Sequence, residues 1–554
     1  MENVYKREEI ADRLFNFRPL FFSAILFALG IIFAYLHIFN GDSVLWGLCL
    51  LPFAAAPFCF CDNFERVWKT LLAVCWLLIC FCLGFLVFRN QTEKFSDATP
   101  YRRQAYVSGN VVVKERNDYN LLLVLEGIHV DGEVENGRLV AYLPIGYAEK
   151  LELSDQLLLY GFIETDTNFF DEFGSFRAYS IRDDLRYVLT DVESVSVIGN
   201  KLDLFAAMRT RMERVVYAGM YETPAAVTMA VLTGNTTGIE SELLENVRRG
   251  GIAHIFAVSG LHMGALYAFC LLLVKKTRLK KMPKFPRYVL MASMLFFYAG
   301  VCGFSASVVR ALILCLVNYA FALIGVKTDL LESLGLAAFL ILLLNPIELF
   351  CVGFLLSFAA CLGIAFLAKP IGHVCDELSK KIILTLSFGK REAVLRSWEE
   401  QEDAPPSIGE SIRRATTSFL SVTLSAQIAT APIQLSAFGY LSAWSLLLNF
   451  LFVPLISAAF SGLLLLVLIA CLLSISWSSV ILYFPSMLWT GVLLAFEAFD
   501  FSSFCIKGVS LTGIGMLCYY LACTFLSDKW NLRKRARRWI AIGLFAAFMI
   551  TTIL

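Results

Sequence analysis

Two histidines and a serine stand out in a run that is otherwise apolar, GGIAHIFAVSGLHMG at residues 250–264. The candidate site residues of this run are the polar residues His254, Ser259 and His262 and the GxxxG pair Gly260 and Gly264. The apolar character continues to Val274, so the segment is long enough to cross a bilayer as a helix. In hydrocarbon, such polar side chains and glycines face other helices or a cavity rather than lipid. The pattern therefore predicts a membrane pore or translocation site.

The geometry of an ideal helix allows two interpretations of the histidines. His254 and His262 lie within about 80° of each other on such a helix, and Ser259 lies one turn before His262. They either line a wet path for a substrate or brace the bundle through hydrogen bonds. A zinc site is not favoured, because neither HxH nor HExxH occurs and the other histidines are distant in sequence. A hydrolase that uses Ser259 and His262 is a weaker alternative, since no orienting carboxylate or Gly-x-Ser-x-Gly turn accompanies the serine.

Further polar residues lie in later apolar runs. Arg310 follows the small-residue stretch GVCGFSAS, where it either contacts phosphate groups of a polyanion or snorkels to the outer interface. Gln427 and Pro432, in LSAQIATAPIQLSAFG, predict a broken or re-entrant helix in the bundle interior. Asn449 is another polar residue of this kind. No GxxxxGK[ST] loop is present, so the sequence predicts no P-loop nucleotide hydrolysis and no cofactor.

The elements that must position these residues are membrane helices. The chain has 554 residues, of which 58% are hydrophobic and 17% charged, and its mean hydropathy is +0.68. This composition predicts a polytopic α-helical membrane protein. The sixteen cysteines do not suggest a disulfide framework, because none falls between residues 90 and 250 and nearly all lie in apolar runs.

The apolar runs give about thirteen expected spans. They lie at 20–39, 43–61, 68–88, 252–274, 288–304, 308–325, 330–345, 347–368, 415–437, 446–472, 478–497, 509–527 and 539–554. The positive-inside rule places the N-terminus, the basic loop at 275–287 and a polar loop at 369–414 in the cytoplasm. It places the C-terminus outside. The expected parts are an N-terminal membrane segment at 1–94, an extracellular domain at 95–200, linking helices at 201–251 and a channel domain at 252–554.

Residues 95–200 have the short alternating runs of a small β-barrel or sandwich. Between residues 94 and 200 there are ten Lys plus Arg and eighteen Asp plus Glu, a net charge of about −8. A domain this acidic should not hold DNA over its whole surface, although a local groove remains open. After it, 201–220 forms an amphipathic helix that either packs on the barrel or lies in the interface. Thr237 and Glu240 predict a capping box at a later helix start.

Four long segments resemble the ComEC-type competence family of DNA-uptake channels. They are AVTMAVLTGNTTGIESELLENVRRGGIAHIFAVSGLHMGAL, YAGVCGFSASVVRALIL, DLLESLGLAAFLILLLNPIELFCVGFLLSFAACLGI and LSAQIATAPIQLSAFGYLSAWSLLLNFLFVPL. Phe170 and Asp171, in NFFDEFGSFRAYSI, are similar to a phenylalanine-aspartate element of the same family. The resemblance covers most of residues 223–460 and implies an OB-fold-like extracellular domain.

The resemblance also implies a function and partners. The chain would pass single-stranded DNA through the lipid bilayer of the cell membrane, with a membrane-held extracellular DNA receptor and a cytoplasmic helicase-like ATPase. An OB fold suggests base stacking on aromatic side chains, for which Tyr106, Tyr119 and Tyr160 are candidates. The chain departs from many members because it lacks the HxHxDH motif of their C-terminal metallo-β-lactamase-like domain. We therefore expect no enzymatic activity here, and any nuclease would be a separate protein.

The sequence leaves two other functions open. A transporter or flippase for another envelope substrate, in a host that does not take up DNA, suits the broken-helix pattern and the acidic outer domain equally well. The membrane-embedded hydrolase with Ser259 and His262 is the third possibility. The sequence favours the DNA channel because the long matching segments are far more specific than a short motif.

Overall fold

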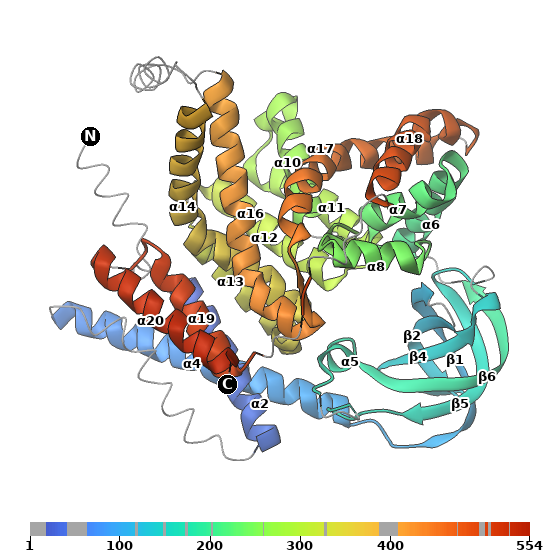
Figure 1. Cartoon of the computed structure of the whole chain (residues 1–554). Helices are drawn as coiled ribbons and strands as arrows, with labels where there is room; N and C mark the ends of the chain where they lie inside the picture. Colours follow the sequence, from blue (N-terminus) through green and yellow to red (C-terminus); the bar gives the residue numbers. More distant parts are fainter. Residues whose placement is uncertain are drawn as a thin grey trace.

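A computed structural model describes residues 18–553, apart from 41–63, 117–119, 148–150, 172–174, 201–202, 257, 259, 326–328, 387–407, 474, 498–504, 508–510 and 531. The described chain is mostly helical, and a small mixed β-sheet region lies to one side of the helices (Figure 1). The predicted span at 43–61, Ser259 and Tyr119 lie outside the described residues.

Six described helices are long and apolar enough to cross a membrane. They cover Pro19–Ile38, Leu72–Ser96, Ala306–Ile324, Val352–Thr385, Trp444–Leu472 and Ile475–Leu494. Two shorter apolar helices cover Leu330–Leu344 and Gly513–Leu526. These helices agree with a multi-span membrane protein, while the larger count drawn from the apolar runs stays a prediction.

The main helices follow one another in a fixed order along the chain. They are α2 (Pro19–Asn40), α4 (Phe64–Ser96), α5 (Ala178–Arg182), α6 (Leu204–Gly219), α7 (Glu222–Thr233), α8 (Ser241–Arg249), α9 (Ala253–Phe256), α10 (Gly260–Lys276), α11 (Lys284–Val301), α12 (Ala306–Ile324), α13 (Leu330–Leu344), α14 (Val352–Leu386), α16 (Ile408–Phe438), α17 (Trp444–Leu472), α18 (Ser478–Glu497), α19 (Gly513–Leu526) and α20 (Lys534–Ile553). A short 3-10 helix, η4 (Pro346–Phe350), joins α13 to α14, and the small strands β7 (Tyr440–Ser442) and β8 (Cys505–Lys507) pair antiparallel.

The β region lies between α4 and α6 in the sequence. Its strands are β1 (Arg102–Arg116), β2 (Asn120–Val130), β3 (Glu133–Val134), β4 (Arg138–Pro144), β5 (Asp155–Thr165) and β6 (Leu185–Asn200). The sheet order is β1-β5-β6-β4-β2-β3, and an additional pairing of β1 with β2 closes the sheet on itself. β4 and β6 are parallel, and the other pairs are antiparallel. Alternate residues such as Leu121, Leu123 and Leu125 are fully buried in the centre, as the period of two requires.

The linking helices pack into the membrane core. The apolar face of α6 carries Met212, Val215 and Val216, which join a large cluster formed mainly by α7, α10, α11, α17 and α18. The apolar face of this helix therefore packs on other helices, whereas the sequence predicted packing on the barrel or at the membrane interface. The barrel touches α6 at its rim, where Arg214 bonds Glu152 at 2.8 Å. The predicted capping box is wrong: α8 begins after Glu240 without a side-chain cap, because the Thr237 hydroxyl bonds the Asn235 side chain at 2.6 Å instead.

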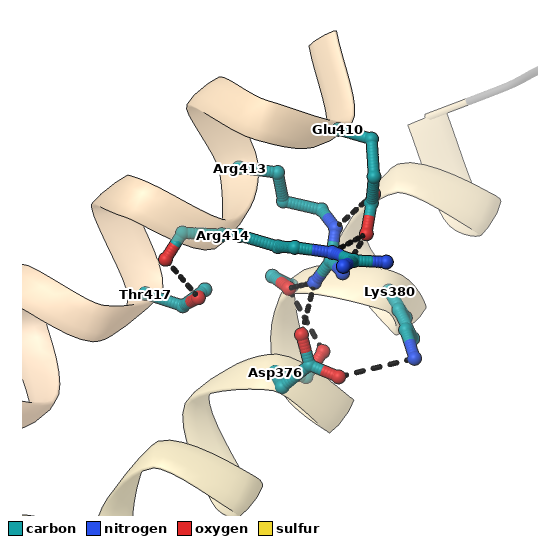
Figure 2. Close-up of polar contacts among 7 residues, drawn as sticks. Asp376, Lys380, Glu410, Arg413, Arg414 and Thr417 are labelled. Atoms are coloured by element: carbon teal, nitrogen blue, oxygen red, sulfur yellow. Dashed lines mark hydrogen bonds and ion pairs between the residues drawn. The ribbon is translucent and has the colours of Figure 1, made fainter. Parts of the chain in front are cut away.

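The polar segment predicted as a loop at 369–414 is helical at both ends. α14 continues through Pro370 to Leu386, and α16 begins at Ile408 (Figure 1). An ion cluster joins these ends: Arg413 donates to Glu410 at 2.7 Å and to the Ser379 hydroxyl at 2.8 Å, and it also pairs with Asp376 (Figure 2). Glu410 is buried, and hydrogen bonds from Arg413 lower its pKa to about 2. The carboxylate therefore stays ionised, and the cluster intact, throughout the physiological range.

The predicted break at Gln427 and Pro432 is wrong, because α16 runs without interruption to Phe438. Proline has no N–H, so the carbonyl of Ile428, four residues earlier, loses its helical donor. The Tyr519 hydroxyl of α19 donates to this carbonyl oxygen at 2.7 Å. A neighbouring helix thus supplies the missing hydrogen bond, and the helix continues through the proline.

We expect Tyr519→Phe to destabilise the membrane part by about 1–3 kcal/mol, since it leaves the partly buried Ile428 carbonyl without a donor. Thermal unfolding of the purified protein in detergent measures the effect. Tyr520→Phe is the matched control, because its hydroxyl bonds Ala429 O at 3.0 Å, a carbonyl that the α-helical pattern already pairs. Equal losses in the two variants would contradict this role of Tyr519.

Candidate functional site

The stretch at 250–264 forms a sharp turn followed by two helices rather than one continuous helix. Gly251 has φ +73°, in the left-handed region that favours glycine. A Cβ at this position would lie 2.5 Å from the Cβ of Ser445 at the start of α17. α9 then ends at Phe256, and α10 begins at Gly260. His254 and His262 therefore do not share one continuous helix face, contrary to the ideal-helix geometry.

The two histidines have different surroundings. His262 is fully buried, and its ring lies 4.8 Å from that of Phe460 in α17. Phe460 in turn packs on Tyr298, whose hydroxyl donates to Leu232 O of α7 at 2.8 Å. His254, in the short helix α9, is exposed. His262 is therefore packed in the core of the helices, whereas His254 is accessible, and the choice between a wet path and bracing stays a prediction.

The glycine pair of α10 adjoins open space. A Cβ at Gly264 would meet no atom within 4 Å, and a Cβ at Gly260 would meet only Ala311 Cβ, at 3.8 Å. Closely packed glycines behave otherwise: a Cβ at Gly84 of α4 would lie 2.2 Å from Phe27 O of α2. Gly260 and Gly264 therefore do not form a tight seam between helices. They leave room beside the start of α10.

Polar side chains from α16 and α17 meet the same turn. Gln427 donates to the Ser445 hydroxyl at 3.3 Å, and this hydroxyl donates to Ser442 O at 2.8 Å. One helical turn further along α17, the Oδ1 atom of Asn449 is buried and has no hydrogen-bond partner among the described residues. Gln427 and Ser445 therefore lie near Gly251, although they are far from it in sequence. A buried amide oxygen of this kind is suited to a water molecule or a polar substrate group.

Arg310 takes neither of the two positions expected from the sequence. Its side chain is 5% exposed, which excludes snorkelling to an interface. The guanidinium instead lies 3.5 Å from the carboxylate of Glu348, and Arg182 lies 3.8 Å from the same carboxylate. Glu348 is not among the residues predicted from the sequence. Its signal is an acidic residue two positions after a proline in an apolar run. Arg310 thus belongs to a buried ion cluster between α12, η4 and α5.

This ion cluster joins the β region to the membrane helices. Asn345 donates to Arg182 O at 3.1 Å and accepts a bond from Gln91 of α4 at 3.0 Å. Close by, the segment with Phe170 and Asp171 forms a small hairpin, in which Asp171 accepts from Ser175 N at 2.7 Å.

Aromatic packing completes the junction. Phe176 of this hairpin packs on Tyr35 and Phe350, with ring centroids 5.0 and 5.3 Å away. Phe170 packs on Phe176 in turn, at 5.9 Å. The phenylalanine-aspartate element therefore belongs to an anchoring hairpin at the junction of barrel and membrane part.

Two of the tyrosine candidates, Tyr106 and Tyr160, lie on the outer face of the β region. Tyr106 of β1 is 54% exposed, and its ring centroid lies 4.6 Å from that of Tyr160 on β5. On the same face of β5, Phe162 is covered by the guanidinium of Arg102 at 5.3 Å. The neighbouring Tyr101 instead stacks inward on Tyr187, and burial raises its pKa to about 12. Tyr106 and Tyr160 are thus available to a ligand.

Comparison with known proteins links this architecture to one family. The family model described as Competence protein matches residues 231–532, from α7 to beyond α19. ComE operon protein 3 of Bacillus subtilis (strain 168) is 28% identical over 163 residues, which are 29% of this chain and 20% of that protein. The similar region thus spans a fifth of the relative's length. No solved structure matches the chain.

The buried ion cluster can be tested by removing its members singly and together. We expect Glu348→Gln to cost about 3–5 kcal/mol, because it leaves the buried Arg310 charge uncompensated. Combining it with Arg310→Met should recover part of the loss, and thermal unfolding in detergent measures this coupling. Strictly additive losses would contradict a structural pair. Arg310→Met that folds normally but loses DNA uptake would instead indicate a phosphate contact.

Proposed function

We propose, from the premise that the chain belongs to the competence protein family, that it conducts single-stranded DNA across the cell membrane into the cytoplasm. The observation that carries the proposal is the family match over residues 231–532, which contains every membrane residue of the candidate site. The accessible His254, the open space beside Gly260 and Gly264, and the buried amide of Asn449 support a polar path near the start of α10.

The β region fits an OB-like domain outside the membrane. Its closed sheet with one parallel pair, β4 with β6, supports this assignment. Tyr106 and Tyr160 would stack on bases of the incoming strand, a contact that tolerates any sequence. We propose that the rigid junction at Glu348 and Phe176 holds this domain over the membrane part, so that a captured strand reaches the path.

Energy for inward movement must come from partners. Moving one charge through 100 mV is worth about 2.3 kcal/mol, so an inside-negative potential opposes each phosphate that enters its field. We propose that a cytoplasmic helicase-like ATPase pulls the strand and that a membrane-held extracellular receptor delivers it. A separate nuclease would remove the second strand, and the chain itself would act as a channel without catalysis. About thirteen spans, a cytoplasmic N-terminus and an outer C-terminus complete the proposal.

Uptake of labelled DNA tests the proposed path. We expect Gly264→Phe to reduce internalised DNA at least about tenfold while the protein folds normally, because the new side chain enters open space and narrows the path. Gly146→Phe is the matched control, since this glycine of the β region also has no atom within 4 Å of a Cβ. Deleting the gene should abolish uptake. Parental uptake in the deletion strain would refute the proposed function.

A transporter or flippase for another envelope substrate is the alternative, and the acidic balance of the outer domain favours it. Binding of the purified protein to single-stranded DNA over a salt series separates the two functions. A DNA channel should show affinity that falls steeply with salt, because phosphate neutralisation releases counterions. Tyr106→Ala and Tyr160→Ala should weaken binding by about 1–3 kcal/mol each. Absence of salt-dependent binding would favour the transporter.

A further inference from the structure

The loop that joins α10 to α11, here called the basic loop (residues 275–287), carries seven cations and no acid. They are Lys275, Lys276, Arg278, Lys280, Lys281, Lys284 and Arg287. The sequence contains no acidic residue between Glu245 and Asp329. Among the residues that the structure describes, no carboxylate forms an ion pair with any of the seven. The basic loop therefore presents positive charge without a counter-charge of its own.

Short-range contacts give the basic loop a defined shape. Thr277 precedes a 3-10 helix, η3 (Arg278–Lys281), and its side chain accepts a hydrogen bond from Leu279 N at 3.3 Å. At the far end, Arg287 donates to Lys280 O at 3.2 Å. This contact uses one cation to close the loop, and the other six basic side chains are exposed. Their charges are thus held together on a compact turn.

Membrane topology alone does not account for such a loop. The positive-inside rule requires lysine and arginine on the cytoplasmic side, and acidic residues contribute little to it. The facing ends of α14 and α16 carry both signs, since Asp376 pairs with Lys380 at 3.0 Å and also with Arg413. The lack of acids in the basic loop is therefore an additional property. It suits a polyanion, because an acid beside the cations would repel phosphate groups.

The basic loop lies at one end of the helix whose other end adjoins the candidate path. α10 begins at Gly260 beside the open space, and its last turn contains Lys275 and Lys276. Its seventeen residues extend about 25 Å along the axis. This end of α10 lies on the side of the molecule away from the β region (Figure 1). A strand that followed α10 from the open space would therefore reach the exposed cations.

An aromatic side chain projects among these cations. Phe285, which follows Lys284 at the start of α11, is 77% exposed. Such a ring can stack on a nucleobase while neighbouring ammonium groups contact phosphates. Cations with an accessible ring are the components of sites that bind single-stranded nucleic acid without sequence preference.

We propose that the basic loop is the exit site at which the single-stranded DNA leaves the path and enters the cytoplasm, an inference that rests on the proposed function. The six exposed cations contact phosphates of the emerging strand, and Phe285 stacks on one base. An inside-negative potential opposes the entry of each phosphate. Favourable contacts at the inner end lower the free energy of the strand there, and they hold it within reach of a cytoplasmic motor.

Lysine acetylation of the full chain in phosphatidylcholine nanodiscs tests the exit site without any substitution. A single-stranded oligonucleotide should slow the modification of Lys276, Lys280 and Lys281, and mass spectrometry of the peptides measures the rates. Lys534, an exposed lysine at the start of α20, is the internal control and should react at its original rate. Equal protection of all four lysines would indicate general electrostatic attraction and would overturn the site.

Oligonucleotide binding over a salt series measures the phosphate contacts. Replacing the three lysines together, by Lys276→Gln, Lys280→Gln and Lys281→Gln, should reduce the magnitude of the slope of log K against log salt by about 2, because each phosphate contact of a single strand contributes about 0.7. The comparison is made in the Tyr106→Ala, Tyr160→Ala background, so that the proposed outer contacts do not contribute. Arginine at the same three loop positions should keep the original slope.

Two further variants separate stacking from charge. Phe285→Ala should weaken binding about tenfold without changing the slope, as the loss of one stacked base predicts. The matched control for the lysine variant removes three exposed cations from the start of α20, by Lys534→Gln, Arg535→Gln and Arg538→Gln. This control should bind like the protein from which it is made. A control slope that falls as far as that of the lysine variant would overturn the exit site.

The outcomes distinguish the exit site from the proposed function. Absence of salt-dependent DNA binding by the parent protein would refute the proposed function and the exit site together. Salt-dependent binding by the parent, with the full slope retained in the lysine variant, would overturn the exit site alone. An effect of the lysine substitutions that disappears in phosphatidylglycerol nanodiscs would assign the basic loop to anionic headgroups of the membrane instead.

Discussion

Hydrocarbon offers no hydrogen-bonding partner, and this constraint governs the polar contacts of the membrane part. The Ile428 carbonyl, freed by Pro432, takes its hydrogen bond from Tyr519 of another helix. The Arg310 guanidinium, buried between helices, takes its counter-charge from Glu348. Leaving such a polar or charged group without its partner costs several times the free energy that an ordinary hydrogen bond contributes. Each contact therefore fixes the positions of the two elements that it joins. Polar residues in this protein therefore determine which helices are neighbours.

Packed and charged contacts between distant segments also hold the β domain against the membrane helices. The barrel is attached through α4 and α6, and two attachments alone would allow it to tilt. The hairpin around Phe176 and the helix α5 insert between these attachments, and they contribute aromatic rings and Arg182 to the membrane part. The β region and the membrane helices are thus connected by packed contacts between side chains. This arrangement suits a substrate that must be threaded from one part to the other.

Small residues allow a second kind of contact between helices, in which the backbones approach closely. α7 has ten buried residues, and seven of them, three of which are alanines, belong to the largest core cluster of the described residues. α2 and α4 cross at Gly30 and Gly84, where a Cβ would lie about 2 Å from the opposing backbone. Close approach of backbones replaces the hydrophobic driving force that is absent between helices in lipid. Gly260 and Gly264 instead adjoin open space, so they do not bring two backbones together. The space beside them is therefore the candidate for a functional path.

Several properties followed from local sequence alone. Apolar runs predicted membrane helices, alternating runs predicted the β region, and four long segments predicted the competence family, which is confirmed by the match over 231–532. These properties depend on the composition and period of contiguous residues, which a chain carries wherever it folds. The positions of His262, Gln427, Asn449 and Arg310 in apolar runs were visible for the same reason.

The partners of those residues were decided by tertiary structure. Arg310 pairs with a glutamate 38 residues away, and Tyr519 completes a helix 91 residues before it. The unbroken course of α16 and the turn at Gly251 depend on atoms from other helices. Pro432 removes a helical donor, which predicts a break, whereas the hydroxyl that replaces this donor belongs to a distant helix. Local sequence thus determined which groups would need partners, whereas only the packing of distant segments determined which partners they found.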